Sequence, residues 1–79
     1  MKIVIYGGGC KSCNALFENT KKAVESAKVD AEIDYVTDMK IIMQKGFLTM
    51  PVLEIDGVVA SKGKVLKSAE IEKLIVQRS

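Results

Sequence analysis

The sequence predicts an α/β domain in which three helices pack against a mixed four-stranded sheet, in the order β-α-β-α-β-β-α. Short runs of β-branched residues alternate with segments of helical periodicity. A strand-helix-strand unit opens the chain and implies a right-handed parallel crossover. An Asp-Gly pair between two apolar runs implies an antiparallel hairpin. With 79 residues, 48% of them hydrophobic, the chain can bury one core, so we expect a single domain over residues 1–79.

The first half of the chain predicts two parallel strands joined by a helix. Residues 2–6 are almost continuously apolar and end at a triple glycine, which is typical of a strand buried on both faces. Residues 31–36 alternate between apolar and acidic side chains and predict a second strand. Between them, from Cys10 to Lys28, apolar or small residues recur every three or four positions, as in an amphipathic helix. These residues are Cys13, Leu16, Phe17, Thr20, Ala23, Val24 and Ala27.

A short helix is expected after the second strand. Asp38 can cap this helix with its carboxylate, and Met39, Ile42 and Met43 then share one face. Met39, Met43 and Met50 could form a surface that binds a soft metal or a peptide, but we interpret Met39 and Met43 as core residues, because their spacing matches that of Ile42. Gly46 stands where helices commonly turn left-handed to end.

The last part of the chain predicts a hairpin followed by a helix. Residues 52–55 and 58–60 are apolar runs on either side of Asp56-Gly57, a strong two-residue turn signal. Ser68 can cap the final helix, with Glu70 in its first turn. The residues of this helix that we expect to face inward are Ile71, Leu74 and Ile75.

Composition and charge exclude several classes of function. Twelve Lys and Arg against ten Asp and Glu give a net charge of +2, and the chain has two Tyr, two Phe, no Trp and no His. A strong basic field and base-stacking side chains are both lacking, so we expect no nucleic-acid partner and no membrane partner. No apolar run approaches the length of a membrane span or a signal-peptide core. We therefore expect a cytoplasmic protein. We further expect a monomer without a cofactor or a metal ion.

Cys10-Lys11-Ser12-Cys13 stands where the first strand gives way to the first helix. Two intervening residues place the cysteines about one helical turn apart, close enough to form and break a disulfide. Free backbone N–H groups and the helix dipole stabilise a thiolate at the helix start, and Lys11 adds a positive charge, so the pKa of Cys10 should be lowered. We assign support of this thiolate to Gly9, Lys11 and Ser12. Cys13 should be more buried and less ionised.

Three other interpretations of the cysteine pair stay open beside catalysis. The first interpretation is that both cysteines are ordinary buried thiols without a chemical role. Such thiols, however, would not need a second cysteine three positions away behind a glycine turn. A Cu(I) carrier also places paired thiolates after its first strand. Such domains, however, resemble Met-x-Cys-x-x-Cys and end in a strand, whereas this chain has Gly8 at the Met position and predicts a final helix. The third interpretation is a redox-sensing module without enzymatic turnover.

With Cys-x-x-Cys after the first strand and Thr49-Met50-Pro51 before the third, the sequence resembles the thioredoxin superfamily over nearly its whole length. Its Gly-x-Gly-Cys-x-x-Cys form and short length are most similar to small prokaryotic thioredoxin- or glutaredoxin-like redox-active disulfide proteins. The resemblance implies a thioredoxin-like fold and thiol-disulfide exchange. It also implies that Pro51 is cis and packs against the disulfide, that the Met50 backbone docks the substrate, and that Thr49 supports this loop.

Some positions depart from the superfamily pattern. Lys11-Ser12 replaces a proline-containing dipeptide, Gly9 replaces an aromatic residue, and no residue matches the buried proton-accepting Asp. The glutaredoxin double glycine is reduced to Gly63, so we do not expect glutathione binding. Lys62 and Lys64 are interpreted as part of a solvated loop rather than as a site for an acidic partner.

The expected reaction is the reduction of a protein disulfide by the dithiol of Cys10 and Cys13. Cys10 is expected to attack the substrate, and Cys13 is expected to resolve the mixed disulfide. The expected partners are a protein that contains a disulfide and an unidentified reductase or dithiol that supplies electrons.

Overall fold

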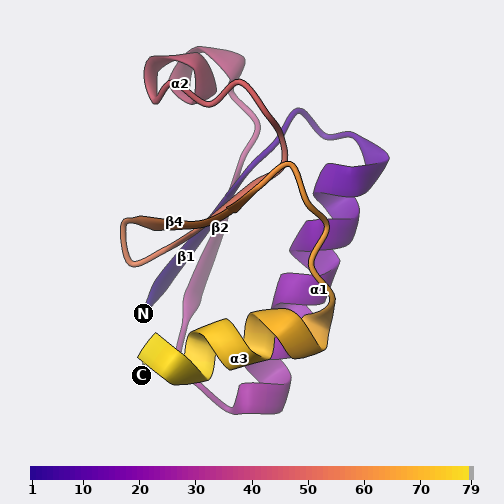
Figure 1. The fold of residues 1–79 in the computed structure, drawn as a ribbon, viewed down its shortest axis with the longest axis vertical. Coiled ribbons are helices and arrows are strands. Elements are labelled where there is room, and N and C mark those ends of the chain that lie inside the picture. Colours follow the sequence, from indigo (N-terminus) through magenta and orange to yellow (C-terminus); the bar gives the residue numbers. More distant parts are fainter. Residues whose placement is uncertain (79) are drawn as a thin grey trace.

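The structure is a computed structural model that describes residues 1–78. Within these residues the chain has the predicted element order, and none of its helices is long and apolar enough to cross a membrane. The elements, drawn in Figure 1, are β1 (Lys2–Tyr6), α1 (Lys11–Ala27), β2 (Glu32–Val36), α2 (Met39–Gln44), β3 (Val52–Ile55), β4 (Val58–Lys62) and α3 (Ser68–Arg78).

The four strands form one mixed sheet in the order β2-β1-β3-β4. β1 runs parallel to β2 and antiparallel to β3, and β3 runs antiparallel to β4, which confirms the predicted mixed sheet. The register aligns Tyr6 with Val36 and Val52, and Val52 with Lys62. These four residues therefore mark one end of the sheet, called here the Tyr6 end. The β1–α1 connection, α2 and the segment before β3 all meet at this end, in the upper part of Figure 1.

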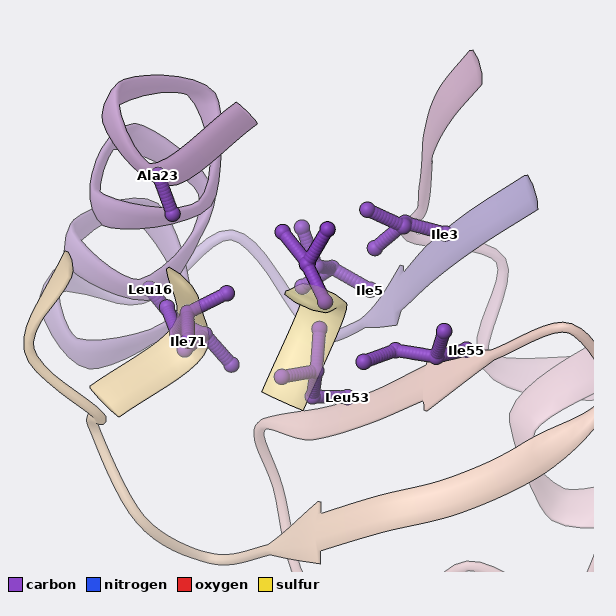
Figure 2. Close-up of a cluster of buried hydrophobic side chains, with 8 residues drawn as sticks. Ile3, Ile5, Leu16, Ala23, Leu53, Ile55 and Ile71 are labelled. Atoms are coloured by element: carbon purple, nitrogen blue, oxygen red, sulfur yellow. The ribbon is translucent and has the colours of Figure 1, made fainter. Parts of the chain in front are cut away.

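One face of the sheet is covered by α1 and α3, which also pack against each other. Alternate residues of β1 and β3 point into this layer and meet the buried stripe of α1, as Figure 2 shows. The cluster consists of Ile3, Ile5, Leu16, Ala23, Leu53, Ile55, Ile71 and Ile75. Thr20 is buried within the same stripe, and its hydroxyl donates a hydrogen bond to the Leu16 carbonyl at 2.7 Å. The helical periodicities of α1 and α3 thus predicted their buried faces correctly.

The opposite face carries a smaller cluster under α2. It consists of Val4, Tyr6, Ile42, Phe47 and Val52, with Val36 and Met50 packed at its margin. The prediction that Met39 and Met43 lie in the core is wrong, since their side chains are 45% and 70% exposed. The reason is that α2 has six residues and contributes Ile42 as its buried side chain, so the neighbouring turns of the helix remain in solvent.

The ends of the elements follow the expected capping and turn residues, with two differences. The Asp38 side chain accepts a hydrogen bond from the Lys40 N–H, as predicted, and Asp56 and Gly57 both adopt positive φ in the hairpin turn. β4 continues to Lys62, two residues beyond its predicted end.

The start of α3 is capped differently from the prediction. Ser68 is the first helical residue, and Lys67 takes the cap position, with its carbonyl accepting from the Ile71 N–H at 3.1 Å. Glu70 accepts a hydrogen bond from the Lys67 N–H at 3.3 Å. The helix start is therefore closed by a glutamate in its first turn and does not need a hydroxyl at the cap.

Candidate active site

The two cysteines meet at the start of α1. Cys10 is exposed and is the N-cap residue, and its sulfur accepts a hydrogen bond from the Cys13 N–H at 3.3 Å. Cys13 is fully buried and is the first residue of the buried stripe of α1. The two sulfurs are free thiols 2.6 Å apart. This is the predicted arrangement of an accessible sulfur in front of a buried one.

The two thiols differ in pKa in opposite directions. The hydrogen bond from the Cys13 thiol lowers the pKa of Cys10, and the backbone N–H groups of Cys13 and Ser12 lower it further. Burial raises the pKa of Cys13, and its hydrogen bond to Cys10 adds to this effect. Lys11 is not among the largest causes, because an exposed charge is screened by water whereas the hydrogen bonds act at contact. The Cys13 thiol and the backbone N–H groups are therefore the main causes of the lowered pKa of Cys10, and support of the thiolate by Lys11 stays a prediction.

The glycine run before Cys10 allows close packing at the first position and a turn at the third. A Cβ on Gly7 would lie 2.5 Å from the Cys13 sulfur and 2.6 Å from its Cβ, so a side chain here would displace Cys13. Gly9 has φ 82°, a left-handed conformation that glycine adopts without strain. Gly8 is freer, since a Cβ there would make an ordinary contact of 3.8 Å with the Met39 sulfur.

A chain of hydrogen bonds links β2 to the loop before Cys10. The Tyr35 hydroxyl donates to Asn14 Oδ1 at 2.8 Å, and Asn14 Nδ2 donates to the Gly9 carbonyl at 3.4 Å. Burial raises the pKa of Tyr35, and negative charge on Cys13 and Cys10 raises it further, so the phenol lies within electrostatic range of both sulfurs. Sequence reasoning missed Tyr35 and Asn14, because nothing in the sequence pairs two residues that are 21 positions apart.

The segment Thr49-Met50-Pro51 lies at the same end of the sheet as the cysteines. Its Met50–Pro51 peptide bond is cis. Pro51 is buried, Met50 is partly buried against the α2 cluster, and Thr49 is exposed. Since Val52 pairs with Tyr6 in antiparallel register, the residue before Val52 lies beside the residue after Tyr6, which is Gly7. The sheet therefore brings this segment next to the glycine that contacts Cys13.

Gly63 joins the site from the end of β4. Its N–H donates to the Pro51 carbonyl at 2.8 Å, and a Cβ at this position would collide with the Thr49 side chain. Gly63 also has φ 69°. In the sequence, Gly63 was noted only as the single glycine that remains of the glutaredoxin double glycine. In the structure, it holds the Thr49 to Pro51 segment in place.

The buried carboxylate of the described residues is on the other face of the sheet. Glu54 on β3 is 8% exposed, accepts a hydrogen bond from the Tyr6 hydroxyl at 3.3 Å and lies 3.9 Å from Lys45 Nζ. Tyr6 belongs to the α2 cluster, whereas Cys13 lies on α1. Glu54 is thus paired within the structure and separated from the cysteines by the sheet.

The arrangement can perform a two-electron exchange between thiols and disulfides. It offers one accessible sulfur of lowered pKa and a second sulfur within bonding reach. In residues 1–78, no group of three or more His, Cys, Asp or Glu side chains gathers around a possible metal position.

Comparisons with known proteins agree with this chemistry. A family model described as a thioredoxin domain matches residues 1–76. The chain is 37% identical over 75 residues to a thioredoxin of Methanothermobacter thermautotrophicus, covering 95% of this chain and 97% of that protein. It is 44% identical over 71 residues to a thioredoxin of Methanocaldococcus jannaschii, covering 90% of this chain and 81% of that protein. With family, fold and cysteine pair in agreement, the chain belongs to the thioredoxin family and is a thiol-disulfide oxidoreductase.

Proposed function

We propose that this oxidoreductase reduces disulfide bonds of other proteins, with Cys10 as the nucleophile and Cys13 as the resolving thiol. The observation that carries this assignment is the asymmetry of the pair. Cys10 is exposed with a lowered pKa, and Cys13 is fully buried with a raised pKa. Since the thiolate is the attacking form and must reach the substrate, the exposed sulfur reacts first.

In the first step, the Cys10 thiolate attacks one sulfur of the substrate disulfide. The substrate S–S bond breaks, a mixed disulfide forms, and one substrate thiolate leaves and takes up a proton. In the second step, the Cys13 thiolate attacks the Cys10 sulfur, and the second substrate thiolate leaves as the Cys10–Cys13 disulfide forms. Two electrons pass from the protein dithiol to the substrate, which ends as two thiols.

Formation of the mixed disulfide in the first step lowers the pKa of Cys13 and so favours its attack in the second step. The hydrogen bond to Cys10 and the negative charge of Cys10 both raise the pKa of Cys13 in the reduced protein. Both effects disappear once the Cys10 sulfur is part of a mixed disulfide, because that sulfur then carries no charge. Burial remains as the cause that keeps the pKa of Cys13 raised, so Cys13 ionises more readily when its attack is required.

Thr49, Met50 and Pro51 are proposed to dock the substrate chain, with the Met50 backbone pairing with it. Support comes from the position of this segment beside Gly7 and from the Gly63 hydrogen bond that holds it. Gly9 and Ser12 are proposed to support the Cys10 thiolate, Gly9 through the turn that presents it and Ser12 through its N–H group.

Proteins of this family act in general on disulfide-containing proteins and are reduced again by a reductase. For this chain we propose that residues 1–79 act as a single domain and a monomer in the cytoplasm, with a reductase or a small dithiol returning two electrons to the Cys10–Cys13 disulfide.

The assignment of the two sulfurs is tested with single serine variants and a protein disulfide as substrate. Cys13→Ser should accumulate a covalent mixed disulfide, seen as a mass increase that dithiothreitol reverses, whereas Cys10→Ser should form none and lose activity. Formation of the adduct by Cys10→Ser, or equal residual activity of both variants, would contradict the assigned roles.

A further inference from the structure

The charges of the molecule are unevenly distributed along the sheet. The segments that meet at the Tyr6 end are residues 7–11, 37–51 and 62–64. They contain one acidic residue, Asp38, and five lysines, which are Lys11, Lys40, Lys45, Lys62 and Lys64. The rest of the sequence has seven basic and nine acidic residues. The small net charge of the whole chain therefore conceals a cationic end that contains the cysteine pair.

These lysines belong to the segments that meet at the Tyr6 end and are mostly without carboxylate partners. Lys11 follows Cys10 directly. Lys62 Nζ is 5.8 Å from the centre of the Phe47 ring, and this ring packs 5.1 Å from that of Tyr6, which immediately precedes the glycine run. Among residues 1–78, the lysine of this group that pairs with a carboxylate is Lys45, at 3.9 Å from Glu54. The positive field at the Tyr6 end is therefore largely uncompensated.

Large apolar side chains are exposed at the same end. Leu48 is 96% exposed and Met43 70% exposed, and both belong to the segment between β2 and β3. Met39 is closer to the cysteines, since its sulfur lies beside Gly8. Unbranched methionine side chains adapt to partners of different shape. The Tyr6 end thus combines exposed apolar side chains with positive charge.

We propose that the protein substrates of this chain carry their disulfide in an acidic segment with an apolar residue next to the reacting cysteine. This inference rests on the proposed function and adds a substrate class to it. Complementary charge attracts such a segment to the Tyr6 end, and a basic segment is repelled from it. Lys62 and Lys64, interpreted from the sequence as part of a solvated loop, thereby contribute to recognition.

The lysines take no part in bond making or breaking. The reaction is the two-electron exchange described above, in which the protein dithiol becomes a disulfide and the substrate disulfide becomes two thiols. Charge complementarity acts on encounter. The preference is therefore expected in kcat/KM at low ionic strength and should decline as salt screens the charges.

The test uses three peptides with the same intramolecular disulfide and the same leucine beside the reacting cysteine. They differ in having glutamate, serine or lysine as flanking residues. At low ionic strength, kcat/KM should be about tenfold higher for the glutamate peptide than for the lysine peptide, a ratio within the range of electrostatic steering. The ratio should approach one in about 0.5 M NaCl, where charges are screened within a few ångströms. Equal rates for the two peptides at both salt concentrations would overturn the inference.

Charge-reversal variants locate the preference on the molecule. Lys40→Glu combined with Lys62→Glu should abolish or invert the ratio of glutamate to lysine peptide. The control combines Lys22→Glu on α1 with Lys73→Glu on α3, makes the same change in net charge, and should retain the ratio. An equal loss in both double variants would mean that net charge, and not the Tyr6 end, sets the preference, and would refute the inference.

Failure of the proposed function gives a different result. Uncharged bis(2-hydroxyethyl) disulfide serves as a substrate that has no flanking charge. If wild-type protein reduces neither this compound nor any of the peptides, the disulfide-reducing function itself is wrong. If it reduces this compound and all three peptides without a charge preference, the function stands and the substrate class is wrong.

Discussion

The two faces of the sheet are covered unequally. On one face, α1 with 17 residues and α3 with 11 residues close over the strands, and the buried cluster there has eight members. On the other face, α2 has six residues, and the cluster has five members. Cys13 belongs to the buried side of α1, whereas exposed Met39 and Met43 belong to α2. The sheet thus separates a closed layer, which contains the buried cysteine, from a layer whose covering helix is largely exposed.

The largest expected difference between the faces is in stability. Ile55 faces α1 and α3, Ile42 belongs to α2, and both are fully buried. Removing the same atoms in Ile55→Ala and Ile42→Ala should cost about 2–5 kcal/mol each, with Ile55→Ala near the upper limit because the closed layer cannot collapse around the cavity. Urea unfolding of the two reduced variants measures this difference, and an equal or greater cost for Ile42→Ala would contradict the comparison.

A smaller difference is expected between neighbouring glycines that approach opposite faces. Gly7→Ala places a methyl group against Cys13, so it should cost about 1–3 kcal/mol as an overpacking change. Gly8→Ala meets the flexible Met39 side chain at 3.8 Å and should stay within about 0.5 kcal/mol of the wild type. The same urea titration provides the stabilities. Thiol labelling of the Gly7 variant should also show increased access to Cys13, and unchanged access would mean that the glycine does not seat this sulfur.

The smallest expected effect is on the ionisation of Cys10. The first cause of its lowered pKa is the hydrogen bond from the Cys13 thiol. Cys13→Ala removes the donor, so the pKa of Cys10 should rise, less thiolate should be present at neutral pH, and alkylation by iodoacetamide should slow. Cys13→Ser keeps a hydroxyl donor and should give a smaller rise. The midpoint of the alkylation rate plotted against pH gives the pKa of Cys10 in each variant. Identical midpoints in wild type and Cys13→Ala would show that backbone N–H groups alone stabilise the thiolate.

Sequence patterns predicted the closed face better than the open one. The stripe of α1 spans 17 residues and repeats often enough to define its direction, so its buried residues, including Cys13 and Leu16, were predicted correctly. The exposure of Cys10 followed from its place at the helix start. In α2 the six residues make fewer than two turns, and the spacing of Met39 and Met43 could not reveal that Ile42 alone is buried in this helix.

The features missed by sequence reasoning depend on contacts between distant segments. The Tyr35 to Asn14 hydrogen bond and the Gly63 to Pro51 hydrogen bond arise only when the sheet aligns their strands. The cationic Tyr6 end arises in the same way, because Lys11, Lys40 and Lys62 belong to different elements. A net charge of +2 averages over the whole surface and contains no information about where like charges gather.

Cys13 is the first residue of the buried stripe of α1, so its burial and its raised pKa depend on the packing of this helix. Before α1 packs against the sheet, both sulfurs are equally exposed to water, and they react with an oxidant equally well. The distinction between the two arises as the helix docks. Partial unfolding of α1 would thus weaken the distinction between the attacking and the resolving sulfur before the whole fold is lost.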